Sequence, residues 1–206
     1  MSDATREETG HDTAREDTAR EDTARENTAR ETATLGGGCF WCLDGALRGV
    51  RGVYRVESGY AGGHVERPSY EQVCSGSTGH AEVVRVEFDP QELPYRELLN
   101  LFFALHDPTT KDRQGHDVGP QYRSIVLVED DGQERIARDV MAELQRQDLW
   151  GAPIVTEVER LTTFWPAEPV HQNYFANHPD NAYCAAVVGP KVAKFRSQFA
   201  ERLQDA

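Results

Sequence analysis

The stretch most suited to chemistry is residues 36–42, where three glycines lead into Cys39, two aromatic residues and Cys42. Apolar residues at positions 43, 46, 47 and 50 follow with helical spacing, so Cys39 should lie at the N-terminus of a helix. The helix dipole and unpaired N–H groups there favour an anion, and we expect the Cys39 thiol to have a pKa below its reference value of about 8.5. Because the thiolate is the nucleophilic form of cysteine, Cys39 is the candidate nucleophile.

A purely structural role is the alternative for this segment. Cysteine is among the most frequently buried residue types, so a single cysteine after a glycine turn would more often be structural. Phe40 and Trp41 between two cysteines favour function instead, because CxxC spacing occurs in redox motifs.

Two further stretches carry polar residues that are too specific for ordinary connections. The first covers residues 58–82 and the second covers residues 106–124. Each contains glycines, tyrosines, histidines and carboxylates in close succession, and both must be brought to Cys39 by the elements around them.

Length and cysteine count limit the class of protein. The chain has 206 residues, which suits one domain with an appendage. No apolar run approaches the roughly 20 residues of a membrane span and no signal peptide is recognisable, so we expect a cytoplasmic protein. Four cysteines are too few for a disulfide-built scaffold in a chain of this size.

The net charge of −13 argues against two kinds of partner. Sequence-independent nucleic-acid binding relies on a basic surface, and an anionic membrane surface would repel this chain, so we expect neither. Only three of the 22 basic residues are lysine. Excess carboxylate with arginine in place of lysine resembles proteins of salt-accumulating organisms, in which screening tolerates high charge, although a GC-rich genome also replaces lysine by arginine.

Residues 1–33 differ in composition from the rest of the chain. A Thr-Ala-Arg-Glu-Asp unit repeats with decay over residues 13–32, and the only apolar side chains in the segment are alanines and Met1. Such a segment cannot form a core, although its Glu–Arg pairs at i,i+4 spacing support a solvated helix. We expect residues 1–33 to be a low-complexity charged tail, disordered or a solvated helix, and residues 34–206 to be a single catalytic domain.

Hydrophobic periodicity gives the order of the elements that follow. Strands are predicted at 32–36, 52–60, 81–88, 121–128 and 154–160, and helices from 39 and at 68–74, 94–105, 132–147 and 191–203. Up to residue 128 this order fits a split βαβ sheet with helices on one face. The predicted fold class is therefore α+β: a two-layer sandwich, a split βαβ (ferredoxin-like) plait with extra helices and an irregular C-terminal segment.

Five motifs occur in order along the chain: Gly-Cys-Phe-Trp, Gly-Tyr-x-Gly-Gly, Val-Cys-Ser-Gly-x-Thr-Gly-His-Ala-Glu, His-Asp-Pro-Thr and Arg-Gln-Gly-x-Asp-x-Gly-x-Gln-Tyr-Arg-Ser. With them the chain resembles the A-type peptide methionine sulfoxide reductases over about residues 34–200. The resemblance implies a two-layer plait around a shallow site and no metal or organic cofactor. It also implies thiol-dependent reduction of methionine S-sulfoxide, free or in proteins, and repair of oxidised proteins.

The resemblance assigns roles to the first motif. Cys39 would attack the sulfoxide sulfur and become a sulfenic acid. Phe40 and Trp41 would line an apolar pocket for the S-methyl group of the substrate, a role that suits their low polarity.

The later motifs would supply the polar side of the site. Tyr60, Tyr122 and Asp117 would line it, and the two tyrosine hydroxyls would donate hydrogen bonds to the sulfoxide oxygen, as a developing oxyanion needs.

Gln72 departs from the family pattern. A glutamate before the Val-Cys pair is described there as the proton donor to the departing oxygen, whereas an amide can orient a group but cannot release a proton. Glu71 would point about 100° away on a helix and does not simply replace it. Either the tyrosine hydroxyls with water supply the proton, or Glu82 or Asp117 reaches into the site.

Two cysteines are candidates for resolving the sulfenic acid as a disulfide. Cys42 lies one helical turn from Cys39, and Cys184 occupies a C-terminal position where members of the family often carry a resolving cysteine. Cys74 is interpreted as structural. The resemblance implies thioredoxin or a similar dithiol as reductant, and we expect a monomer.

Three other functions compete with this one. A generic CxxC dithiol oxidoreductase would use Cys39 and Cys42 alone and would not need the tyrosine and aspartate loops. A zinc-binding module would use all four cysteines, although Cys74 and Cys184 lack the spacing of typical structural sites. An inactive interaction protein is the third alternative while Gln72 is unexplained.

Overall fold

The computed structural model describes residues 30–204. Strand β1 begins at Glu31, so residues 31–33 belong to the sheet and the domain starts earlier than the predicted position 34. The rest of the predicted charged tail, residues 1–29, lies outside the described residues.

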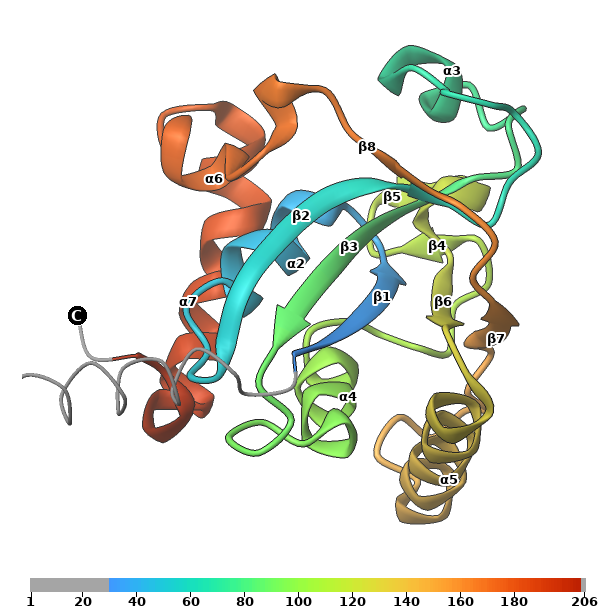
Figure 1. Cartoon of the computed structure of the whole chain (residues 1–206). Helices are drawn as coiled ribbons and strands as arrows, with labels where there is room; N and C mark the ends of the chain where they lie inside the picture. The colour runs from blue at the N-terminus through green and yellow to red at the C-terminus, as the bar shows by residue number, and fades with distance from the viewer. Residues whose placement is uncertain (1–29, 205–206) are drawn as a thin grey trace, which may run out of the picture. The chain divides into compact units, whose positions relative to one another are not determined.

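A six-stranded mixed sheet forms the centre of the domain, with strand order β7-β6-β1-β3-β2-β8 (Figure 1). Neighbouring strands are antiparallel except β6 and β7, which run parallel. The strands are β1 (Glu31–Gly37), β2 (Val53–Ala61), β3 (Ala81–Phe88), β6 (Ser124–Val128), β7 (Glu157–Arg160) and β8 (Phe164–Pro166). A separate hairpin pairs β4 (Arg113–Gln114) with β5 (Asp117–Val118).

The α-helices in residues 30–204 are α2 (Phe40–Leu47), α3 (Tyr70–Cys74), α4 (Tyr95–Ala104), α5 (Asp131–Gln147), α6 (Tyr174–Asn177) and α7 (Gly189–Gln198). All of these except α6, which lies in the segment expected to be irregular, were predicted from the sequence. A π-helical turn over Cys184–Val188 leads directly into α7. None of the described helices is long and apolar enough to cross a membrane.

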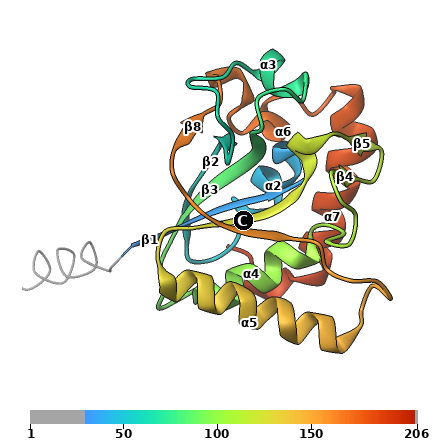
Figure 2. The ribbon, with the colours of Figure 1, turned by 90° about the vertical axis from the view of Figure 1, so that its right-hand side faces the viewer.

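The main core lies between one face of the sheet and the longer helices (Figure 2). Val84, Val86 and Phe88 project from β3 onto this face because side chains alternate along a strand. Helices α2, α4, α5 and α7 all contribute buried side chains to the same cluster. The predicted α+β fold, a mixed sheet with helices, is confirmed.

The opposite face of the sheet has a smaller core. Val83, Ile125 and Leu127 pack there against Phe164, which lies at the start of β8. The Arg85 guanidinium stacks over the Phe164 ring, 4.1 Å from its centre. Strand β8 was not predicted, because three residues carry no periodic signal.

Several predicted boundaries are wrong by a few residues, including the start of β7, which lies at Glu157 and not at residue 154. The strand predicted at 121–128 begins at Ser124, because Pro120–Tyr122 forms a 3₁₀ turn before it. The helix predicted at 191–203 runs instead over Gly189–Gln198. Pro190 suits the first turn of that helix, where its missing N–H has no partner to lose.

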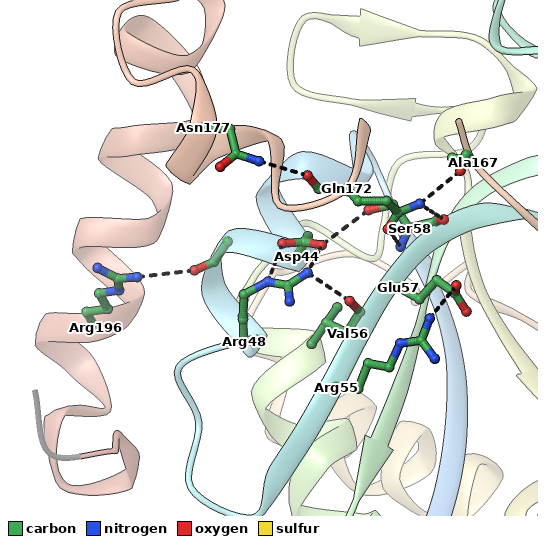
Figure 3. Close-up of polar contacts among 11 residues, drawn as sticks. Asp44, Arg48, Arg55, Val56, Glu57, Ser58, Ala167, Gln172, Asn177 and Arg196 are labelled. Atoms are coloured by element: carbon green, nitrogen blue, oxygen red, sulfur yellow. Dashed lines mark hydrogen bonds and ion pairs between the residues drawn. The ribbon is translucent and has the colours of Figure 1, made fainter. Parts of the chain in front are cut away.

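A partly buried ion pair fixes α2 to the sheet (Figure 3). Asp44 is 1% exposed and accepts hydrogen bonds from Arg48 Nε at 3.0 Å and Nη2 at 2.7 Å. Arg48 also donates to the Val56 carbonyl at 2.8 Å, and the Ser58 hydroxyl donates to Asp44 at 3.4 Å. Because Val56 and Ser58 belong to β2, the helix that carries the cysteines is held to a central strand.

Gln172 attaches the C-terminal segment to the same strand (Figure 3). Its Nε2 donates to the carbonyls of Ser58 at 2.9 Å and Ala167 at 3.0 Å, and its Oε1 accepts from the Ser58 N–H at 2.9 Å. One amide side chain therefore satisfies both backbone groups of Ser58 and holds the segment that precedes α6.

We predict that Asp44→Asn lowers the free energy of unfolding by about 2 kcal/mol, because the charge that Arg48 pairs with is lost from a buried position. Urea denaturation measures this change. Glu57→Gln is the matched control, since the Arg55–Glu57 pair lies at the surface, and it should cost less than about 0.5 kcal/mol. Equal losses in the two variants would contradict the assigned role of Asp44.

Candidate active site

The glycine turn before Cys39 is required by close packing. Gly38 has a φ of +91°, and a Cβ atom there would lie 2.6 Å from Cγ of Gln114. Glycine suits this left-handed and crowded position because it has no Cβ. Cys39 follows as the N-cap of α2, and the Cys42 N–H donates to its carbonyl at 3.1 Å. The predicted position of Cys39 at a helix N-terminus is confirmed.

The Cys39 side chain is 7% exposed, and burial raises the pKa of its thiol well above the ordinary value. A hydrogen bond with the Cys42 thiol and the negative charge of Glu82 raise this pKa further, while the Trp41 backbone N–H lowers it. The expectation that the helix terminus lowers the pKa of Cys39 is therefore wrong. Desolvation of the thiolate outweighs the helix dipole.

Glu82 supplies a buried carboxyl group next to this turn. It lies on β3, is 1% exposed, and accepts a hydrogen bond from the Phe40 N–H at 3.1 Å. Burial raises the pKa of Glu82 to about 8, although the bond from Phe40 lowers it, and the charges of Asp117 and Cys42 add to the rise. At neutral pH the group is mostly a neutral carboxylic acid, which can donate a proton.

Gln72 is exposed on the short helix α3. Its Oε1 accepts from the Ser69 N–H at 2.9 Å, and its own N–H donates to Ser69 Oγ at 3.3 Å. This reciprocal pair is a capping box, which satisfies two unpaired N–H groups at the helix start. The orienting role predicted for Gln72 in the site is not supported, because its side chain is used in the cap.

Tyr60 also differs from the prediction. Its side chain is fully buried in β2, and its hydroxyl donates to Glu168 Oε2 at 2.9 Å. The other oxygen of Glu168 accepts from the Tyr70 N–H at 2.8 Å. Glu168 therefore links Tyr60 on β2 to the start of α3, and the Tyr60 hydroxyl, paired with Glu168, is not placed to donate to a substrate.

Two other tyrosines lie near the buried carboxyl. Tyr122, as predicted, and Tyr70, which the sequence analysis missed, both have pKa values raised first by burial and then by the charge of Glu82. The Tyr70 hydroxyl hydrogen-bonds the Cys74 thiol. Two features of the sequence could have identified Tyr70. It lies in the polar stretch 58–82, and on a helix its side chain would point in a different direction from that of Gln72.

Asp117, on β5, contacts the C-terminal segment. Tyr183 donates a hydrogen bond from its hydroxyl to Asp117 Oδ2 at 2.7 Å. The charge of Asp117 also raises the pKa of Glu82, so the two carboxyl groups interact. The hairpin and β3 therefore both contribute to the surroundings of Cys39.

Aromatic rings form the apolar side of the site. Phe40 is fully buried and its ring centre lies 6.4 Å from that of Tyr70, in a stacked arrangement. Trp41 stacks on Tyr174 with ring centres 3.8 Å apart and packs edge-on against Tyr183 at 6.0 Å. The predicted aromatic wall at Phe40 and Trp41 therefore extends into the C-terminal segment.

All four cysteines are free thiols. Cys39, Cys42 and Cys184 are buried, whereas Cys74 is exposed on α3, so its expected burial is wrong. Cys184 begins the π-helical turn, and its N–H donates to Asn181 Oδ1 at 3.2 Å. Over residues 30–204 we find no group of three or more histidine, cysteine or carboxylate side chains arranged to hold a metal ion.

The site can now be compared with known proteins. The sequence model of the family described as "Peptide methionine sulfoxide reductase" matches residues 31–203, and the chain belongs to this family. A relative named peptide methionine sulfoxide reductase MsrA, from Ralstonia nicotianae, is 58% identical over 177 residues, which cover 84% of this chain and 93% of the relative.

Solved structures agree with this assignment. The reduced form of Mxr1 from Saccharomyces cerevisiae has a TM-score of 0.72 at 34% identity, covering 77% of this chain and 91% of that chain. Mxr1 in complex with Trx2 has a TM-score of 0.51 at 25% identity, covering 72% and 86% of the two chains.

We predict that alkylation of Cys39 has a pH midpoint above that of free cysteine, because burial disfavours the thiolate. Glu82→Gln should lower this midpoint, since it removes the negative charge that Glu82 carries at high pH. Iodoacetamide labelling at a series of pH values, followed by mass spectrometry of the peptide, measures both midpoints. A Cys39 midpoint below that of free cysteine would restore the helix-dipole interpretation.

Proposed function

We propose that the protein reduces methionine S-sulfoxide, free or in oxidised proteins, to methionine, with Cys39 as the nucleophile. The observation that carries this proposal is the buried carboxyl group of Glu82, which the Phe40 N–H holds beside the Cys39 turn and whose pKa burial raises to about 8. Family membership supports the reaction and favours it over a generic dithiol oxidoreductase.

The first step moves the sulfoxide oxygen to Cys39. The Cys39 sulfur bonds to the sulfoxide sulfur while Glu82 gives its proton to the sulfoxide oxygen, and the proton of the thiol returns to Glu82. The original S–O bond then breaks, the hydroxyl group bonds to the Cys39 sulfur, and the bond between the two sulfur atoms breaks with its electron pair staying on the methionine sulfur. The products are methionine and a Cys39 sulfenic acid. Glu82 thus ends the step protonated. Because the Cys39 thiol gives up its proton during the attack, its raised pKa does not require a thiolate to form beforehand.

The substrate would lie between the aromatic rings and the polar groups. Trp41 suits the S-methyl group, because its partly exposed ring presents apolar surface, and the fully buried ring of Phe40 stacks against it. Tyr122 suits the sulfoxide oxygen as a hydroxyl donor near Glu82, and Tyr70 would do so by exchanging its bond with the Cys74 thiol for one to the substrate. The raised pKa values of both tyrosines keep them protonated.

The second step forms a disulfide and releases water. We infer that Cys42 attacks the Cys39 sulfenic acid, because the two thiols already hydrogen-bond each other. Cys184 is buried at the start of the π-helical turn, so its participation requires that this segment moves. We therefore assign Cys42 as the first resolving cysteine and Cys184 as the second.

A dithiol protein would close the cycle by reducing the disulfide. The structural likeness to Mxr1 in its complex with Trx2 supports a thioredoxin-type reductant for this chain. The composition supports a cytoplasmic protein with no nucleic-acid or membrane partner. We expect a monomer, which size-exclusion chromatography with light scattering would test.

We also infer that the central strands form the split βαβ, ferredoxin-like plait expected from the sequence. The order β6-β1-β3-β2 supports it, with β3 antiparallel to β1 and β2 and inserted between them. Strands β7 and β8 extend this unit at its two edges.

We predict that Cys39→Ser abolishes methionine formation in a single turnover without reductant, whereas Cys42→Ser and Cys184→Ser each retain the first turnover. The reason is that only Cys39 meets the sulfoxide. Peptide mapping after one turnover should find the Cys39–Cys42 disulfide first in the parent protein.

Each result can contradict part of the proposal. Retained single-turnover activity in Cys39→Ser would overturn the assignment of the nucleophile. A Cys39–Cys184 disulfide as the first product, with none between Cys39 and Cys42, would exchange the order of the two resolving cysteines. Equal rates on both sulfoxide epimers would contradict the proposed selectivity for the S form.

A further inference from the structure

A cavity of about 790 Å³ lies between α4, α7 and the C-terminal end of α5. The three helices can be followed in Figure 2. Its lining does not include Cys39 or the aromatic side chains that surround it. The volume lies within the roughly 300–1,000 Å³ of pockets that bind small molecules.

The walls of this cavity combine polar side chains with apolar and aromatic ones. They include a buried pair, Phe103 and Phe195, and three partly buried side chains, Leu144, Trp150 and Phe199. Partly buried rings at the edge of a cavity can cover the apolar body of a ligand, because they lose little freedom on binding.

The cationic side chains in the lining are unusual for this chain. The protein has only three lysines and a net charge of −13, yet two of the three lysines, Lys191 and Lys194, line this one cavity. Neither lysine forms a salt bridge with another residue in the described part of the chain. Lys191 is only partly exposed, so its ammonium group would gain from an anionic partner.

The acidic side chains of the lining already have partners. Glu143 accepts a hydrogen bond from Arg96 at 3.1 Å. Asp107 accepts two bonds from Thr109, at 2.9 Å from the N–H and 2.6 Å from the hydroxyl. Arg96 is used by Glu143, so Lys191 and Lys194 are the lysine and arginine side chains of this lining that are left without an ion pair among the described residues.

We propose that this cavity binds a small organic anion whose apolar body lies against Phe195 and Trp150 and whose carboxylate is held by Lys191 and Lys194. The cavity volume suits a small molecule, the aromatic side chains suit its apolar body, and the two neighbouring lysines suit its carboxylate. The inference does not depend on the proposed activity.

The cavity also adjoins the turn that presents Cys39. His106 and Gln114 line it. A Cβ atom on Gly37 would lie 3.0 Å from the His106 ring, and a Cβ atom on Gly38 would lie 2.6 Å from Gln114. A bound anion would thus contact the side chains that support the glycine turn.

The probe for this site is 4-phenylbutyrate, titrated into the full chain by calorimetry, with the neutral 4-phenylbutanamide as matched ligand. We expect saturable binding of the carboxylate with a dissociation constant near or below about 1 mM, and binding of the amide at least about tenfold weaker. Quenching of Trp150 fluorescence should accompany binding and disappear in Trp150→Phe.

The protein variants test the lysines. Lys191→Gln with Lys194→Gln should weaken binding of 4-phenylbutyrate at least about tenfold, whereas Lys111→Gln, the third lysine and outside the cavity, should change it less than about twofold.

No saturable binding, equal binding of the amide, or an unchanged double variant would each overturn the proposal. An acidic peptide that displaces 4-phenylbutyrate and binds more tightly would overturn the small-anion assignment. 4-Phenylbutyrate and the peptide are compared on the unaltered protein, so the result of this comparison does not depend on whether a variant folds.

Discussion

The hydrogen bond from the Phe40 N–H to Glu82 is the interaction on which the site depends. It joins the first residue of α2 to β3, and so fixes Cys39 against a carboxyl group that the sheet has removed from water. Burial raises the pKa of Glu82 to about 8, whereas an unfolded glutamate titrates near about 4.3. As pH rises between these values the unfolded chain loses this proton before the folded chain does, so the contribution of Glu82 to stability falls with rising pH.

The remaining contacts position the two sides of the site around that bond. Asp44 and Arg48 hold α2 to β2, and Gln172 holds the C-terminal segment to the same strand. Tyr183, the residue before Cys184, donates a hydrogen bond to Asp117 and so holds the C-terminal segment to the β4–β5 hairpin. Segments far apart in the sequence therefore meet at Cys39 through a small number of buried polar contacts.

The sequence allowed the position of Cys39 and most strands and helices to be predicted, because glycine runs and apolar periodicity are local signals. Side-chain partners are not local. Gln72 is used in a helix cap and Tyr60 is paired with Glu168, and neither contact follows from a motif. The pKa of Cys39 was predicted in the wrong direction, because the depth of burial depends on how the whole fold packs. Glu82 was recognised only as one alternative, since its place on a strand does not reveal which groups surround it.

The central claim is that Glu82 is a neutral acid which protonates the departing oxygen. The most direct test is the single-turnover rate of Cys39 sulfenic acid formation against pH, in the parent, Glu82→Gln and Gln72→Ala. The account predicts that the parent rate falls as pH rises through about 8, because Glu82 loses its proton there. Gln72→Ala should keep this profile, while Glu82→Gln should be at least about tenfold slower below that pH and lack the fall. A parent rate that rises through pH 8, or a Glu82→Gln variant with the parent profile, would contradict the account.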